Sequence, residues 1–183
     1  MTRPAIPAAA TLLAVALIGL LVYGVVQRRE DTSLDAAISA GLLPPAPGAD
    51  VRLPSLSGER PTALADLRGQ VVVLNFWASW CDPCIAEAPA LERAQQRLQR
   101  EGGTVLGVTY KDFADESRRF VRRYGITYPT VRDDRLELAP KFGTNKLPET
   151  FVLDTRGRIV AASRGQVDSA FLTRAIDRAL EPR

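Results

Sequence analysis

Residues 71–84 read VVVLNFWASWCDPC, and this stretch decides the fold of the 183-residue chain. Its first seven residues form an apolar run that predicts a buried strand. The segment after Cys84 repeats apolar residues at spacings of three and four, which predicts a helix. A Cys-x-x-Cys pair between a strand and a helix places Cys81 at the helix N-terminus, where free backbone N–H groups and the helix dipole stabilise a thiolate. The sequence therefore predicts thiol–disulfide exchange.

Cys81 and Cys84 are the only cysteines of the chain, and several other roles compete with redox exchange. A structural zinc ion needs about four ligands, which two thiols in a chain without histidine supply only through a dimer. A purely structural disulfide across so short a loop constrains little of the unfolded state. The absence of histidine excludes a Cys–His nucleophile and weakens copper delivery. A peroxiredoxin would carry threonine where this chain has Ala78, so redox exchange remains the favoured interpretation.

The N-terminal segment has no charged residue between Arg3 and Arg28 and is rich in Leu, Val, Ala and Ile. About 20 such residues span a hydrocarbon core of roughly 30 Å as a helix. A cleaved signal peptide is the alternative, but the run has no clear small-x-small site at its end. We expect an uncleaved membrane anchor over residues 1–29, a Pro/Gly-rich linker over 30–50 and a globular domain over 51–183.

The globular domain alternates strands and helices, which predicts an α/β sheet covered on both faces. Strands are expected at 71–77, 104–110, 128–132, 150–154 and 158–164, with a short edge strand at 51–57. Helices are expected at 82–101, 115–124, 135–142 and 168–180. The net charge of +3 is too small to indicate a nucleic-acid partner. A cluster of arginines on the second helix is either a solvated face or a docking site for an acidic partner, and it comprises Arg118, Arg119, Arg122 and Arg123.

The stretch 75–84, followed by Glu87 and Pro89, resembles the thioredoxin superfamily and within it the membrane-anchored TlpA/ResA-like reductases. Downstream, the segments at 107–112 (GVTYKD) and 147–151 (LPETF) are similar to the CcmG/DsbE branch, which serves cytochrome c maturation. The resemblance covers roughly residues 50–180. It implies a thioredoxin-like fold with a central mixed sheet, helices on both faces and an extra helix–strand unit near 115–132.

The two cysteines and one carboxylate are expected to carry the chemistry. Cys81, at an exposed helix start, is the expected nucleophile, and Cys84, one turn later, is the more buried thiol that resolves the mixed disulfide. Thioredoxins place a buried aspartate where this chain has Asn75, so another group must handle the Cys84 proton. Glu87 matches the glutamate of the TlpA/ResA-like pattern and lies on the same helical face as Cys84.

The resemblance also implies a substrate-binding surface. Pro148 resembles the cis-proline that faces the cysteine pair, and a cis bond there exposes the backbone of Leu147 to an extended substrate. Glu149, beside this proline, is the second candidate for the acid or base, as in the CcmG-like branch. Trp80 is expected to line the substrate surface, whereas Trp77 is equally consistent with a place in the core.

The implied activity is reduction of protein disulfides on the periplasmic side of a bacterial cell membrane, with the Cys81–Cys84 pair as the redox centre and no other cofactor or metal. The implied substrate is the Cys-x-x-Cys-His segment of apocytochrome c or the maturation protein that handles it. The implied electron donor is a membrane thiol reductase of the CcdA or DsbD type. Two alternatives stay open: a general or oxidising exchange protein, and a redox-inert binding or metal-delivery module on the same fold.

Overall fold

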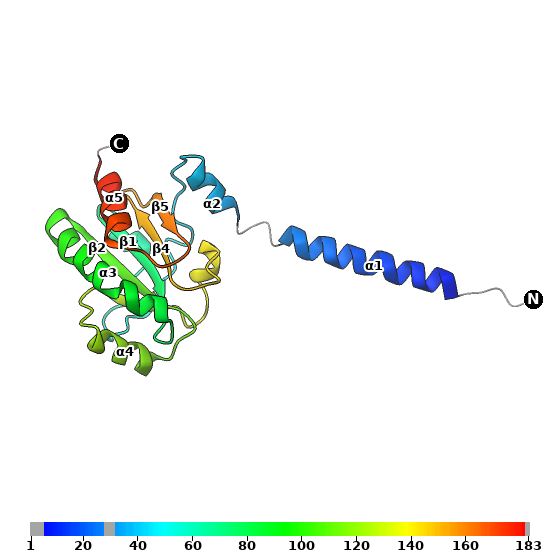
Figure 1. Cartoon of the computed structure of the whole chain (residues 1–183), viewed down its shortest axis with the longest axis horizontal. Helices are drawn as coiled ribbons and strands as arrows, with labels where there is room; N and C mark the ends of the chain where they lie inside the picture. Colours follow the sequence, from blue (N-terminus) through cyan, green and yellow to red (C-terminus); the bar gives the residue numbers. More distant parts are fainter. Residues whose placement is uncertain (1–5, 28–31, 182–183) are drawn as a thin grey trace, which may run out of the picture. The chain divides into compact units, whose positions relative to one another are not determined.

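The computed structural model describes residues 6–27 and 32–181. The chain forms two compact units, Met1–Ser33 and Leu34–Arg183. The first unit contains α1 (Ile6–Gln27), an uninterrupted helix (Figure 1). Among the described residues, no helix is both long and apolar enough to cross a membrane. The membrane anchor expected at the N-terminus is therefore not confirmed.

The second unit is built on a five-stranded sheet in the order β3-β2-β1-β4-β5. β1 (Val71–Trp77) lies at its centre, parallel to β2 (Gly103–Thr109) and antiparallel to β4 (Glu149–Leu153). At the edges, β3 (Thr130–Arg132) runs parallel to β2, and β5 (Ile159–Ser163) runs antiparallel to β4. Every residue of β1 and β2 is buried, as expected for parallel strands covered on both faces. The mixed sheet predicted from the sequence is confirmed.

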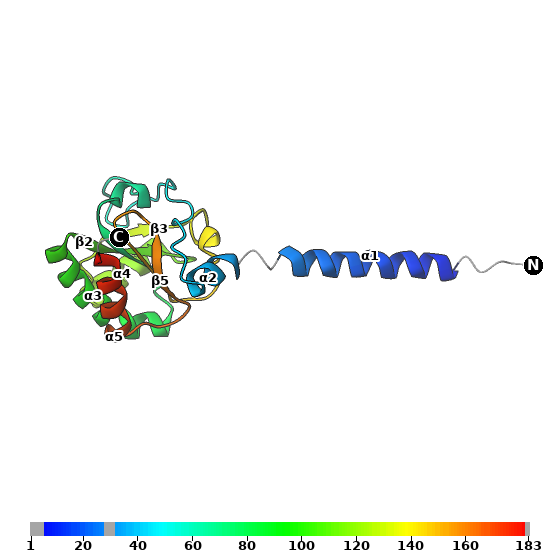
Figure 2. The ribbon, with the colours of Figure 1, turned by 90° about the horizontal axis from the view of Figure 1, so that it is seen from above.

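Two long helices, α3 (Asp82–Glu101) and α5 (Ser169–Leu180), pack against each other on one face of the sheet (Figures 1 and 2). The apolar residues of α3 recur every three or four positions, so they form one buried stripe against the strands. The helix ends at Gly102, whose φ of 78° is a left-handed conformation that favours glycine. On the same side, α4 (Ala114–Arg123) packs Phe120 against Trp77 with a centroid distance of 4.5 Å.

The opposite face is covered by shorter elements: α2 (Thr32–Ser39) and the 3-10 helices η1 (Leu64–Leu67) and η2 (Ala139–Phe142). Leu34 and Ile38 of α2 pack against the same apolar cluster as the buried residues of the two 3-10 helices. The helical cover predicted on both faces is thus present, but on this face it consists of short segments.

The structure differs from the linker expected over residues 30–50. Residues 34–50 belong to the compact domain: Ala46 is buried and its N–H donates to the Gly157 carbonyl at 2.9 Å, and the Ile159 N–H donates to the Pro44 carbonyl at 2.8 Å. These backbone hydrogen bonds fix a Pro/Gly-rich segment that has no periodic pattern of its own. The hydrogen-bond partners of this segment lie more than 100 residues further along the chain, so they cannot be recognised from the local sequence. The local sequence alone therefore indicates a linker.

Two further local predictions are wrong. The edge strand expected at 51–57 is reduced to isolated bridges, which join Leu53 to Thr62 and Ser55 to Val131. The helix expected at 135–142 shrinks to η2, because the backbone of Leu136 has a positive φ of 56° and Gly143 ends the turn with φ 66°. Both errors concern short segments, where a few apolar residues are weak evidence for regular structure.

Candidate active site

The cysteine pair lies where β1 runs into α3. After Trp77 the chain makes a turn in which the Cys81 N–H donates to the Ala78 carbonyl at 3.2 Å. Cys81 is the N-cap of α3, and its Sγ accepts a hydrogen bond from the backbone N–H of Cys84 at 3.3 Å. The two sulfurs form a disulfide. The predicted placement of Cys81 at the helix N-terminus is confirmed, and the N–H that would stabilise its thiolate already points at the sulfur.

The exposure of the pair differs from expectation. Cys81 is 4% exposed and Cys84 is 3% exposed, so Cys81 is not the accessible thiol that the sequence predicts. In this disulfide form the Cys81 sulfur is bonded to Cys84 and lies against the first turn of α3, where it accepts the Cys84 N–H. Trp80, by contrast, is 61% exposed, and its indole N–H donates to the Lys111 carbonyl at 3.1 Å. An exposed tryptophan thus stands next to a disulfide just below the surface.

A buried polar cluster lies behind the cysteines, between α3 and the sheet. Glu87, one turn after Cys84, is 1% exposed. Its Oε1 accepts from Asn75 Nδ2 at 2.8 Å, and its Oε2 accepts from the backbone N–H of Val167 at 2.9 Å. The same Asn75 amide nitrogen donates to Thr150 Oγ1 at 3.1 Å. The cluster therefore joins α3, which carries Cys84 and Glu87, to β1 through Asn75 and to β4 through Thr150.

Burial is the main influence on the acidity of this carboxyl. Removal from water raises the pKa of Glu87 from 4.5 to about 7, against the hydrogen bonds from Val167 and Asn75, which lower it. A carboxyl with a pKa near neutrality can both accept and release a proton under physiological conditions. Glu87 is thus suited to the proton handling that the sequence predicts for it.

The register of the central strands brings the proline loop to the same end of the sheet as the cysteines. β4 is antiparallel to β1, and its first residue, Glu149, pairs with Phe76. Pro148, directly before Glu149, therefore lies beside the end of β1 at which the segment leading to Cys81 begins. The Leu147–Pro148 peptide bond is cis, as the resemblance implies. Leu147 is partly buried and packs against the apolar clusters of both faces.

Glu149, the second candidate for the acid or base, makes contacts that do not suit this role. Its carboxylate is 2% exposed and forms an ion pair with Arg164, while its Oε1 accepts from the backbone N–H groups of Asn145 and Lys146 at 3.4 Å. Arg164 also binds Asp35 of α2, with its Nη2 at 2.9 Å from Asp35 Oδ1. The geometry thus ties Glu149 to the loop before the cis-proline and favours a structural role for it.

We expect Arg164→Gln to destabilise the domain by about 3 kcal/mol, because Glu149 would remain buried and lose its ion-pair partner. Urea denaturation of the oxidised protein measures this. The matched control is the double variant Arg164→Gln/Glu149→Gln, in which no buried charge is left and part of the lost stability should return. Equal stability of the wild-type, single and double variants would show that the pair does not hold the loop.

Sequence reasoning misses two members of this site. In the sequence Asn75 is notable only as a replacement for aspartate, whereas the structure makes it the direct partner of Glu87. Arg164 gives no signal, because it lies 15 residues from Glu149 and 129 from Asp35 in the chain. In the part of the chain that the structure describes, no group of three or more Cys, Asp or Glu residues is placed to hold a metal ion.

A Cys-x-x-Cys disulfide at the N-terminus of a helix that follows the central strand, beside a cis-proline loop, is the arrangement of a thiol–disulfide oxidoreductase with a thioredoxin-like fold. The model of the AhpC/TSA family matches residues 45–162, and the chain belongs to this family.

Named relatives agree with this class. The chain is 35% identical to thiol:disulfide interchange protein HelX of Rhodobacter capsulatus over 85% of this chain and 84% of that protein. It is 34% identical to thiol-disulfide oxidoreductase ResA of Geobacillus thermodenitrificans over 60% of this chain; the match covers 63% of that protein, slightly less than two thirds. A solved structure from Chlorobium tepidum, described as a thiol:disulfide interchange protein DsbE, is 26% identical with a TM-score of 0.69, over 76% of this chain and 97% of that one. The resemblance to thiol–disulfide oxidoreductases is therefore confirmed, and a redox-inert module is set aside.

Proposed function

We propose that this oxidoreductase works as a reductase of protein disulfides outside the cytoplasm, in the maturation of c-type cytochromes. The observation that carries the exchange chemistry is the Cys81 sulfur at the N-cap of α3, where it accepts the Cys84 N–H. The assignment to cytochrome maturation is supported by the CcmG/DsbE-like segments at 107–112 and 147–151 and by the similarity to HelX. A general exchange protein on the same fold is the competing function.

The proposed reaction starts from the dithiol form. The Cys81 thiolate attacks one sulfur of the substrate disulfide, forming a mixed disulfide and releasing the other substrate sulfur as a thiolate, which takes up a proton. The Cys84 thiolate then attacks Cys81 Sγ, and the second substrate sulfur leaves as a thiolate, which also takes up a proton. The substrate gains two electrons, and the protein is left with the Cys81–Cys84 disulfide, which is the form seen here.

The second step needs Cys84 to lose its proton in a place where water is scarce, since this residue is 3% exposed. We assign the acceptor role to Glu87, one helical turn away on the same face. A carboxyl with a pKa of about 7 is ionised often enough to accept the proton and can release it again to complete the cycle.

Substrate binding is assigned to the surface beside the disulfide. Trp80 offers an exposed aromatic face fixed by its hydrogen bond to Lys111. The backbone of Leu147, next to the cis bond to Pro148, is assigned to pair with an extended segment of the substrate. A Cys-x-x-Cys-His segment of apocytochrome c, or the maturation protein that presents it, is an extended disulfide-bearing chain of this kind.

The test uses reduced full-length protein and a synthetic Cys-x-x-Cys-His peptide in its disulfide form. We expect rapid reduction of this peptide and a much slower reaction with a scrambled peptide whose cysteines form a larger ring. Equal rates with both peptides would remove the cytochrome assignment and favour general exchange. Net oxidation of the reduced peptide by the disulfide form would reverse the proposed direction.

We further propose that residues 1–29 tether the domain to a bacterial cell membrane, with a membrane thiol reductase of the CcdA or DsbD type as electron donor. The support is the uncharged apolar sequence between Arg3 and Arg28 and the TlpA/ResA-like pattern. Expression followed by carbonate extraction tests the tether: the protein should stay in the membrane pellet, and a variant without residues 1–29 should not. Recovery of both proteins in the soluble fraction would contradict the proposal.

A further inference from the structure

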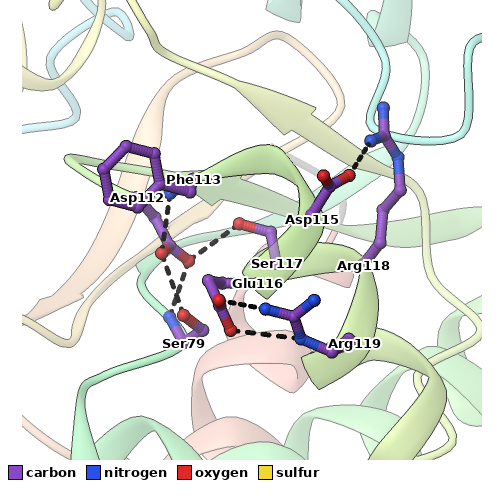
Figure 3. A network of polar contacts seen from close by, with 8 residues as sticks. All are labelled: Ser79, Asp112, Phe113, Asp115, Glu116, Ser117, Arg118 and Arg119. Carbon is purple, nitrogen blue, oxygen red and sulfur yellow. Dashed lines mark hydrogen bonds and ion pairs between the residues drawn. The ribbon is translucent and has the colours of Figure 1, made fainter.

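Asp112, just after the end of β2, gathers four hydrogen bonds at its carboxylate (Figure 3). Its Oδ1 accepts from Ser79 Oγ at 2.9 Å and from the backbone N–H of Phe113 at 2.9 Å. Its Oδ2 accepts from the backbone N–H of Ser79 at 2.8 Å and from Ser117 Oγ at 2.7 Å. Asp112 therefore ties the turn that precedes Cys81 to the first turn of α4.

Two neighbouring contacts join the same pair of loops. The Tyr110 N–H donates to the Trp77 carbonyl at 3.0 Å, and the Trp80 indole donates to the Lys111 carbonyl at 3.1 Å. Lys111 has a positive φ of 52°, which is uncommon for a residue with a side chain. Such a conformation persists where surrounding contacts hold it. Here Tyr110 and Asp112, the two neighbours of Lys111, are hydrogen-bonded to Trp77 and Ser79 in the segment that leads to Cys81, which we call the cysteine loop.

The remaining acidic residues of this segment serve α4 itself. Asp115 and Glu116 form ion pairs with Arg118 and Arg119, each three residues later on the same helix (Figure 3). Asp112 alone among these three carboxylates binds the cysteine loop. Asp112 thus differs from the other two carboxylates, because it binds the turn before Cys81 as well as the start of α4.

We propose that Asp112 is a positioning residue for the exchange reaction, because it fixes the turn that carries Cys81. In the oxidised form the disulfide itself restrains this turn, since it links Cys81 to α3. Once the disulfide is reduced or Cys81 is bonded to substrate, that restraint is gone. The hydrogen bonds of Asp112 to Ser79, together with the two neighbouring contacts, then keep the Cys81 sulfur aligned with the sulfur under attack. Attack on a disulfide depends on such alignment.

The experiment measures the second-order rate constant of the reduced full-length protein with 2-hydroxyethyl disulfide, a small probe that needs no docking surface. Asp112→Ala should lower this rate constant about tenfold or more. Asp112→Asn, which keeps one acceptor oxygen, should restore part of it. The matched control is Asp115→Ala, which removes an equivalent charge three residues away and should leave the rate within about twofold of wild type, the size expected of an exposed charge.

Two further measurements separate positioning from a loss of stability. The amide hydrogen of Ser79 should exchange faster in Asp112→Ala than in the control. The double variant Asp112→Ala/Ser79→Ala should be no slower than Asp112→Ala alone, because both changes break the same contact. Should Asp112→Ala not fold, Asp112→Asn and Ser79→Ala still give the rates. The proposal is overturned if the Asp112 variants react as fast as the control, or if the effects of Asp112 and Ser79 multiply.

Discussion

Cys81→Ser is expected to abolish turnover of disulfide substrates, with a loss on the order of 1,000-fold or more, whereas Cys84→Ser is expected to trap substrate on the protein. The reason is the different position of the two sulfurs. Only Cys81 sits at the N-cap with an N–H directed at its sulfur, while Cys84 lies inside the first turn. Non-reducing electrophoresis and mass spectrometry after reaction with a disulfide peptide measure both effects.

Each cysteine variant is the control for the other, because both lack the disulfide and carry the same substitution. We expect a stable mixed disulfide with Cys84→Ser and none with Cys81→Ser. A mixed disulfide that accumulates on Cys84 in the Cys81→Ser variant would reverse the assigned roles. Full activity in either variant would contradict a two-cysteine mechanism.

Glu87 is expected to make the stability of the oxidised protein fall by about 3 kcal/mol between pH 4.5 and pH 7. In the unfolded chain this carboxyl releases its proton near pH 4.5, whereas the folded protein holds it until about pH 7. The folded protein thus binds more protons in this window, so its stability declines as the pH rises through it. Chemical denaturation at closely spaced pH values measures the effect, and the absence of histidine from the chain keeps the window simple.

Glu87→Gln should remove this pH dependence. Between pH 5 and pH 8 the free energy of unfolding of the variant should fall less than that of the wild type. The Asn75 Oδ1 atom is buried without a hydrogen-bond partner among the described residues, so a rotated Asn75 amide can accept from the amide group that the substitution introduces. The resolving step should slow about a hundredfold, because no carboxylate remains to take the Cys84 proton.

The control for Glu87→Gln is Glu101→Gln, at the exposed end of the same helix. This variant should keep both the pH dependence and the rate of wild type. An unchanged stability profile in Glu87→Gln would show that another group titrates in the window. An unchanged resolving rate at every pH would exclude Glu87 from the mechanism.

The central part of the fold follows from local patterns in the sequence. β1 and α3 have the predicted bounds, because an unbroken apolar run and a long amphipathic repeat dominate their neighbourhoods. The remaining strands lie within two residues of prediction at each end, but the order in the sheet and the antiparallel placement of β4 emerge only from packing. α2 is not predicted, because its two apolar contacts, Leu34 and Ile38, precede a Pro/Gly stretch that is typical of a linker.

The site divides in the same way. Cys81, Cys84, Glu87 and Pro148 can be found from motifs, because their spacing along the chain carries the chemistry. The contacts that support these residues cannot be found from motifs. Asp112 reaches Ser79 across 33 positions, and this contact depends on β2 lying beside β1 in one register. Periodicity and motifs contain no information on such contacts.

The central claim is that the Cys81–Cys84 couple works as a reductant, and its reduction potential tests this most directly. Full-length protein is equilibrated in thiol–disulfide buffers, and the fluorescence of Trp77 and Trp80 reports the redox state. We predict a value near or below about −220 mV, towards the roughly −270 mV of thioredoxin. A value near about −120 mV, typical of a strong oxidant, would contradict the account and assign the protein to disulfide formation.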